Sequence, residues 1–347
     1  MKITEKSAGI FTEFKLPYKN FYMSSTSNGL LYLPVNDKSS SGMPNKLVAY
    51  NLSSEEEKTV FDSQLRAPNI QGVQSNKDWL MWIDTNEFGT ESILYAENIS
   101  NKKKNVIYKT NQIIDPFLYE NYISWLDIDS EKNIAHVIVY DLKTNTKKVI
   151  AELESFNSYS STLHMNNGKL VYSNSSNGKT SIYVYELESG KISIYPIPHH
   201  NIMKLRIVGN KIFYTSFINP ENPLPETYFI LDMQTKSVFP IFENDIKGTL
   251  ENSIGLVSAV KDYMVFQTTD QEVWIFKLED KGYHKLALST SNIFKVSMSE
   301  NGDIHLICDN FHSTLNNNTQ FIKLLPHKIM EQIVQKKEIE SYNVPGI

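Results

Sequence analysis

Apolar residues in this chain gather in short runs separated by polar turns, and the runs lack the 3.6-residue period of helices. One run recurs with an aromatic residue or leucine as its anchor. Its seven copies place that anchor at Tyr50, Tyr95, Tyr140, Tyr185, Leu231, Phe276 and Phe321. Successive anchors are 45, 45, 45, 46, 45 and 45 residues apart. So constant a period predicts seven copies of one structural unit.

Each unit contains more than the anchor strand. A second strand precedes it and opens on Asn, Asp or Gly, residues that tolerate the positive φ of a tight hairpin. A polar turn after six of the anchors leads into a fourth short strand, as at residues 58–61 and 147–150. Four strands in about 45 residues is the size of a propeller blade. The sequence therefore predicts an all-β protein, a single seven-bladed β-propeller over residues 1–326.

The two ends of the propeller suggest how its last blade is completed. The seventh anchor, Phe321, is followed by Leu324, Leu325 and Pro326, which make a poor fourth strand. Residues 10–14 form a spare apolar strand before the first unit. Because a closed sheet leaves no free edge, we expect this N-terminal strand to complete blade seven.

Beyond the propeller, residues 327–347 are predicted to form a helix and tail. Ile329, Met330, Ile333 and Val334 share one face of a helix over residues 327–341. Such a stripe needs a surface to cover it. Packing on the propeller itself is the simpler interpretation, and a handle for a partner or a second copy is the other.

Charge and composition narrow the class of partner. The net charge is −5, and arginine occurs only at Arg66 and Arg206, so bidentate phosphate contacts are scarce and nucleic acid is not expected. No apolar run approaches the roughly 20 residues of a spanning helix, so membrane insertion is not expected. The single cysteine, Cys308, lies in a strand-like run and is interpreted as a buried hydrophobe. A lone cysteine also fits a reducing compartment, and we expect a cytoplasmic protein.

Two of the units carry a W-x-D motif, Trp82-Ile83-Asp84 and Trp125-Leu126-Asp127, ahead of the anchor segment. With segments such as Val139-Tyr140-Asp141-Leu142, they resemble the TolB-like, WD40-like propeller repeats of bacteria. The resemblance covers nearly the whole chain and implies the propeller fold. It does not narrow the function, because such repeats serve translocation accessories, peptidase gate domains, lyases and surface modules. Blades five to seven lack the W-x-D.

Propellers usually bind ligands on the face formed by loops that enter the innermost strands and loops between the second and third strands. The loops that enter the innermost strands contain Lys247 and the candidate binding residues Arg66, Asp115, His199, His200 and Asp245. The loops between the second and third strands comprise residues 84–91, 127–133 and 219–226.

Two of these candidates, His199 and His200, are adjacent histidines that could supply a metal ligand or a base. Neutral imidazole serves as a metal ligand or a base near pH 7. No second histidine pair or HExxH helix accompanies them, so a solvent-exposed loop pair is the simpler interpretation. Clustering with Asp115 or Asp245 in three dimensions would favour a site.

Other motifs point to structure more than to chemistry. Asp127, Asp129, Glu131 and Asn133 alternate as in a calcium loop, but Lys132 and Ile138 stand where an EF-hand needs glycine and glutamate. We interpret them as a solvated acidic hairpin. No GxSxG elbow, CxxC pair or dinucleotide fingerprint is found, so we assign no catalytic residue, metal ligand or cofactor.

The tryptophans are Trp79, Trp82, Trp125 and Trp274, and three of them occupy positions predicted to face between blades. Packing between blades, where large aromatics bury the most area, is the simpler interpretation. Stacking on a sugar or a peptide is the alternative if they are exposed.

The leading functional hypothesis is a non-enzymatic scaffold that binds a protein or peptide through one loop face. A first alternative is a propeller enzyme, a lyase or hydrolase acting at the channel mouth with His199, His200, Asp115 and His164 as candidates. A second alternative is a structural subunit of a larger assembly, attached by the C-terminal helix. The sequence leaves the ligand, the face used and the oligomeric state open.

Overall fold

The computed structural model describes residues 2–3, 11–18, 24–37, 43–129, 131–153, 163–176, 178–219, 222–241, 254–260, 262–268, 272–279, 282–289, 293–299, 302–309, 320–336 and 341–343. At some of these positions only the backbone is described. The chain divides into two compact units. The central unit comprises Met1–Lys2, Tyr122–Leu288 and Lys337–Ile347, and the flanking unit comprises Ile3–Asn121 and Ser289–Lys336.

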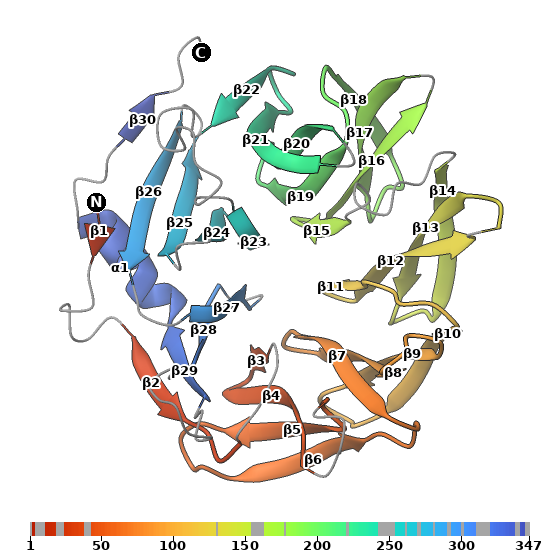
Figure 1. Cartoon of the computed structure of the whole chain (residues 1–347), viewed down its shortest axis with the longest axis vertical. Coiled ribbons are helices and arrows are strands. Elements are labelled where there is room, and N and C mark those ends of the chain that lie inside the picture. The colour runs from red at the N-terminus through yellow and green to blue at the C-terminus, as the bar shows by residue number, and fades with distance from the viewer. Residues whose placement is uncertain are drawn as a thin grey trace. The chain divides into compact units, whose positions relative to one another are not determined.

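The flanking unit contains three complete blades, each a sheet of four strands (Figure 1). Blade one is β3 (Ser25–Ser27), β4 (Leu30–Val35), β5 (Lys46–Asn51) and β6 (Glu57–Asp62). Blade two is β7 (Pro68–Ser75), β8 (Trp79–Asn86), β9 (Ser92–Asn98) and β10 (Lys104–Thr110). Blade seven is β27 (Ile293–Met298), β28 (Ile304–Asp309), β29 (Gln320–Leu325) and β2 (Thr12–Lys15).

The remaining four sheets belong wholly or mostly to the central unit. Blade three is β11 (Phe117–Tyr119), β12 (Tyr122–Asp129), β13 (Ile134–Asp141) and β14 (Thr146–Leu153). Blade four is β15 (His164–Asn166), β16 (Lys169–Ser176), β17 (Lys179–Glu186) and β18 (Ile192–Ile197). Blade five is β19 (Ile202–Val208), β20 (Lys211–Asn219), β21 (Asn222–Asp232) and β22 (Val238–Ile241). Blade six is β23 (Ile254–Val260), β24 (Tyr263–Thr268), β25 (Glu272–Glu279) and β26 (Gly282–Ser289).

The architecture is the predicted seven-bladed β-propeller, with four strands per blade. Blade seven is completed as expected by the N-terminal strand. β2 pairs antiparallel with β29, with Thr12 opposite Leu324 and Lys15 opposite Phe321. The strand begins at Thr12, and Ile10, where we expected it to start, lies outside the described residues.

The predicted turn residues close the inner hairpins. Asn28 and Asn167 have φ of 52° and 50° in the turns β3–β4 and β15–β16, where an ordinary side chain would be strained. Asparagine tolerates this conformation because its short polar side chain bonds locally.

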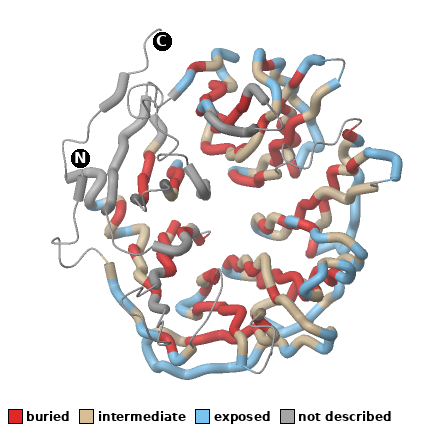
Figure 2. The backbone as a smooth tube through the Cα atoms, viewed as in Figure 1, coloured by how far each residue is buried: buried red, intermediate tan, exposed pale blue. Residues whose placement is uncertain are grey.

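Apolar clusters between neighbouring blades form the core. One joins Tyr32 and Leu47 of blade one to Leu80 and Trp82 of blade two, and another joins blade five to blade six around Trp274. All four tryptophans are buried, as predicted. Figure 2 shows buried positions along middle strands such as β5 and β8 and exposed ones on outer strands such as β6 and β14.

The C-terminal segment differs from the prediction. Helix α1 spans His327–Lys336, whereas we expected it to reach Ser341. Ser341 instead begins a strand, β30 (Ser341–Asn343), which pairs with β26 of blade six, as does β1 (Lys2–Ile3). The open edge of β26 offers backbone hydrogen bonds to an extended segment, and a local helical pattern cannot reveal that long-range pairing.

Helix α1 packs on blade seven within the flanking unit. The Asp303 carboxylate accepts a hydrogen bond from the backbone N–H of His327 at 2.8 Å and so caps the helix. A Cβ at Gly302 would lie 2.7 Å from the His327 ring, so the two residues are in close contact. Met330 is fully buried. The side chains of Ile333 and Val334 lie outside the described residues, as does that of Cys308.

Within the described part of the chain, no helix has the length and apolar character needed to span a bilayer.

Candidate functional site

The histidine pair lies where the sequence placed it, in the loop of residues 198–201 between β18 and β19. The His199 ring bonds the Tyr214 hydroxyl through Nδ1 at 2.8 Å and stacks on Phe229 with ring centroids 3.7 Å apart. Burial lowers the pKa of His199, and the neighbouring His200 lowers it further. His199 is therefore a neutral ring packed on blade five.

His200 is more exposed but is also held. Its Nδ1 lies 3.2 Å from the Thr180 hydroxyl, and its backbone carbonyl accepts a hydrogen bond from the Ser216 hydroxyl at 2.6 Å. The loop is thus tied to both blade four and blade five. Asp245 and Lys247 lie outside the described residues, so their distance from this pair is not described.

His164, the third histidine candidate, is buried in the central unit. Its Nδ1 accepts a hydrogen bond from the backbone N–H of Ile207, and its Nε2 donates to the carbonyl of Ala259, each at 3.2 Å. Burial holds the pKa of His164 well below its usual value. In this neutral tautomer the side chain links β15, β19 and β23, a structural use of both nitrogens.

The acidic hairpin of blade three also uses its charges locally. Asp129 pairs with Lys132 at 2.8 Å, and Asp127 lies 3.6 Å from Lys147. Among the residues that the structure describes, no group of three or more His, Cys, Asp or Glu side chains is arranged to hold a metal ion.

Arg66 and Asp115 lie in the flanking unit, on exposed loops next to blade two. Three segments meet there: residues 63–67 lead into β7, residues 87–91 join β8 to β9, and residues 111–116 lead into β11. We call these three segments the blade-two loop face. The backbone N–H of Glu87 donates to the carbonyl of Ala67 at 2.8 Å, which joins the first segment to the second.

The second and third segments meet at a glycine. Gly89 has φ of 66°, and a Cβ there would lie 2.7 Å from Cγ1 of Ile113. Its backbone thus lies against the Ile113 side chain in a conformation that favours glycine. The turn itself is shaped by Asn86, whose side chain bonds both the backbone N–H and the hydroxyl of Thr90 at 2.9 Å.

The third segment is fixed at its end by Gln74 of β7. The Gln74 amide donates to the carbonyl of Pro116 at 2.8 Å and accepts from the backbone N–H of Leu118 at 2.9 Å. Because of these two bonds, the chain enters β11 at a position fixed by β7.

Two large apolar side chains are nevertheless exposed on this face. Phe88 is 75% exposed and Ile113 is 62% exposed, the two highest values among the large hydrophobic residues that the structure describes. An isolated exposed apolar residue is ordinary, but two on adjoining, well-held loops form a patch.

The carboxylate of the blade-two W-x-D motif, Asp84, is hydrogen-bonded to the first segment of this face. Asp84 is 2% exposed and accepts a hydrogen bond from the Ser63 hydroxyl at 2.7 Å. Ser63 in turn accepts from the backbone N–H of Leu65 at 3.1 Å. Burial raises the pKa of Asp84 to about 6, the Ser63 hydrogen bond opposes the rise, and the charge of Glu91 adds to it.

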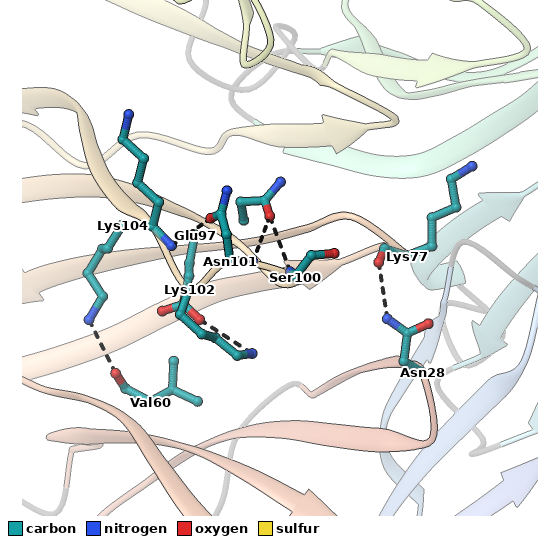
Figure 3. A network of polar contacts seen from close by, with 10 residues as sticks. Asn28, Val60, Lys77, Glu97, Ser100, Asn101, Lys102 and Lys104 are labelled. Atoms are coloured by element: carbon teal, nitrogen blue, oxygen red, sulfur yellow. Dashed lines mark hydrogen bonds and ion pairs between the residues drawn. The ribbon is translucent and has the colours of Figure 1, made fainter.

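At the opposite end of blades one and two the polar groups are paired (Figure 3). The Asn28 amide donates to the carbonyl of Lys77 at 3.0 Å, and the Lys104 ammonium donates to the carbonyl of Val60 at 3.2 Å. Lys102 lies 3.7 Å from the buried Glu97. These contacts hold turns together and leave the loop face as the better candidate.

The sequence predicted Arg66, Asp115 and the range of residues 84–91 for this face. It did not single out Asp84 or Phe88 within that range, and it did not name Ile113. The signal for Phe88 was available. An aromatic residue stands between Asn86 and Gly89, at the apex of a hairpin where polar residues are usual.

Several solved structures are similar to this chain. The β-propeller domain of the trilobed protease from Pyrococcus furiosus is 12% identical, with 89% of this chain and 94% of that chain covered and a TM-score of 0.56. An oligogalacturonate lyase in complex with manganese is 11% identical, with 92% and 97% covered and a TM-score of 0.55. This chain shares their β-propeller fold.

A prolyl endopeptidase structure has a TM-score of 0.60 at 12% identity. There the match covers 96% of this chain and 51% of that one, so the chain spans about half of that enzyme. Neither a model of a known protein family nor the sequence of a curated protein matches this propeller. At such identities the likeness shows the fold alone.

Proposed function

We propose that this propeller is a non-enzymatic binding module that engages a protein or peptide through the blade-two loop face. The observation that carries the proposal is the exposure of Phe88 and Ile113, at 75% and 62%, on adjoining loops. Arg66 lies on the loop beside them. Aromatic and arginine side chains are enriched at protein interfaces.

The way the loops are held supports the same function. Gln74, Asn86 and the Glu87–Ala67 backbone bond fix all three segments before any partner arrives. A surface ordered in advance loses less conformational entropy on association. Rigid loops that display apolar side chains are thus suited to binding.

The enzyme alternative has weaker support. Some structures with the same fold are lyases and peptidases, but the likeness is limited to the fold. His199 and His164 are engaged in structural contacts. The alternative therefore rests on residues such as Asp245 that lie outside the described part.

The structural-subunit alternative relied on helix α1 as an attachment. Met330 is buried and His327 contacts Gly302, so this helix already uses part of its surface within its own unit. The W-x-D motifs support placing the propeller among the TolB-like repeats, a placement that is compatible with a binding role.

Site-specific photo-cross-linking tests the proposal. Phe88 is replaced by a photo-reactive phenylalanine analogue in the source cells, and a matched variant carries the analogue at Ile194, which is 55% exposed on β18. We expect discrete protein adducts from position 88 and none of these from position 194. Identical adducts from both positions, or none from position 88, would contradict the proposal.

A further inference from the structure

The charges around Phe88 and Ile113 are mostly of one sign. Glu87, Glu91 and Asp115 are exposed on two of the three segments, against the single cation of Arg66 on the other. The carboxylate of Asp84 is buried, is hydrogen-bonded to Ser63 of the first segment, and lies close enough to Glu91 for that charge to raise its pKa. The apolar patch is thus surrounded by a field that attracts cations.

We propose that the segment bound by the blade-two loop face is basic, with an apolar side chain that packs on Phe88 and Ile113 and a lysine or arginine beside it. This inference rests on the proposed function and adds the chemistry of the partner. Complementary charge sets both the specificity and the rate of association at such surfaces.

Asp84 makes the preference for a cation stronger than exposed acids alone would. Its hydrogen-bond partner, Ser63, is neutral, and among the described residues the charge that acts on its pKa, that of Glu91, is negative. A buried carboxylate near neutral pH is costly without a compensating charge. A basic side chain bound at the loop face supplies the compensating charge. Its attraction to Asp84 acts mainly through protein, where the dielectric constant is lower than in water.

The first test identifies the preferred sequence. A library of random twelve-residue peptides displayed on phage is selected at pH 7.5 against the whole chain, with counter-selection on the Phe88→Ser, Ile113→Ser variant. We expect enrichment of peptides with an aromatic or aliphatic residue close to lysine or arginine. Enrichment of neutral or acidic peptides would overturn the inference.

The second test measures the charge effect. A selected peptide is titrated by calorimetry into the unmodified protein, into Asp84→Asn and into Glu91→Gln. We expect each variant to weaken binding about threefold to tenfold, as loss of a complementary charge does. Asp127→Asn is the matched control, because Asp127 occupies the same motif position in blade three and lies beside Lys147; its affinity should not change.

The pH dependence of peptide binding distinguishes the contribution of the buried Asp84 from that of the exposed acids Glu87, Glu91 and Asp115. Binding should weaken as the pH falls from 7.5 to 5, and Asp84→Asn should reduce that dependence. Unchanged affinity in both Asp84→Asn and Glu91→Gln would refute the charge inference, whereas the proposed function would survive if binding still required Phe88. No Phe88-dependent peptide and no cross-link at position 88 would refute both.

Discussion

The loop of residues 198–201 and the blade-two loop face differ in the chemistry of their side chains and in whether those side chains are already in contact with the protein. The first has reactive side chains, yet His199 is stacked on Phe229 and bonded to Tyr214, and His200 contacts Thr180. The second has a phenylalanine and an isoleucine that remain exposed on firmly held loops. A loop is therefore not available for binding merely because it carries a reactive residue type. Its availability depends on whether its side chains already make contacts within the protein.

The largest effect expected from this comparison is on stability. His199→Ala should lower the free energy of unfolding by about 3 kcal/mol, because it leaves the buried Tyr214 hydroxyl without this partner and removes the stack on Phe229. Urea denaturation followed by tryptophan fluorescence measures it. Phe88→Ser, the matched change on the other loop, should stay within about 0.5 kcal/mol of the unmodified protein. Equal losses in both variants would erase the distinction between the loops.

Asp84→Asn, in contrast, should raise the free energy of unfolding. The pKa of Asp84 is about 6 in the folded protein against an ordinary 3.8, so the folded state binds the proton more tightly, and stability falls as the pH rises through that window. Asparagine still accepts the Ser63 hydrogen bond but carries no charge. The variant should be more stable by about 2 kcal/mol at pH 7.5.

That gain should shrink toward zero below about pH 3, where the Asp84 carboxyl is protonated in both the folded and the unfolded state. Thermal unfolding at several pH values measures the difference. A gain that did not depend on pH would point to packing and not to charge.

A smaller effect is expected at the contact between the second and third segments. Gly89→Ala should cost about 1–2 kcal/mol, because φ is 66° and the added Cβ displaces Ile113. Gly178→Ala is the matched control, since φ is 70° there and nothing lies within 4 Å of the added carbon. Both variants should lose stability from backbone strain, but only Gly89→Ala should weaken peptide binding. Equal binding by the two would show that the position of Ile113 is unimportant.

The smallest effect concerns acid. Because the pKa of His199 is lowered in the folded state, the unfolded chain binds more protons below the ordinary value of 6.5, and stability falls as the pH drops through it. His199→Gln should reduce the loss between pH 7 and pH 5 by a few tenths of a kcal/mol, allowing for solvent screening. The buried His164 and His305 contribute to the acid response of both proteins equally. If the denaturation midpoint falls by the same amount between pH 7 and pH 5 in the unmodified protein and in His199→Gln, the prediction is wrong.

Most of the fold was predictable because its signal repeats. Anchors such as Tyr95 and Tyr140 recur at one period, and each copy confirms the others, so errors in single strands do not matter. The N-terminal strand was predictable because blade seven otherwise lacked an outer strand. The end of helix α1 was not, because Ser341 is placed by pairing with β26 rather than by its sequence neighbours.

The candidate site was predictable only as a set of loops. Arg66 and Asp115 were placed on the correct kind of loop by strand order alone. The burial of Asp84 and the exposure of Phe88 depend on how neighbouring segments pack, and a repeat pattern says nothing of that. His199 was prominent in the sequence because of its residue type, whereas its stack on Phe229 comes from a strand 30 residues away.

The pairing of β2 with β29 also determines when blade seven can be completed during synthesis of the chain. Thr12 must wait for Leu324 to be synthesised before it can pair, a delay of roughly 15 to 60 s at the usual rates of bacterial or eukaryotic translation. During that interval blade one can form while the strand that precedes it has no partner. Strand β2 is thus synthesised long before its partner β29 and is among the last strands of the propeller to be paired.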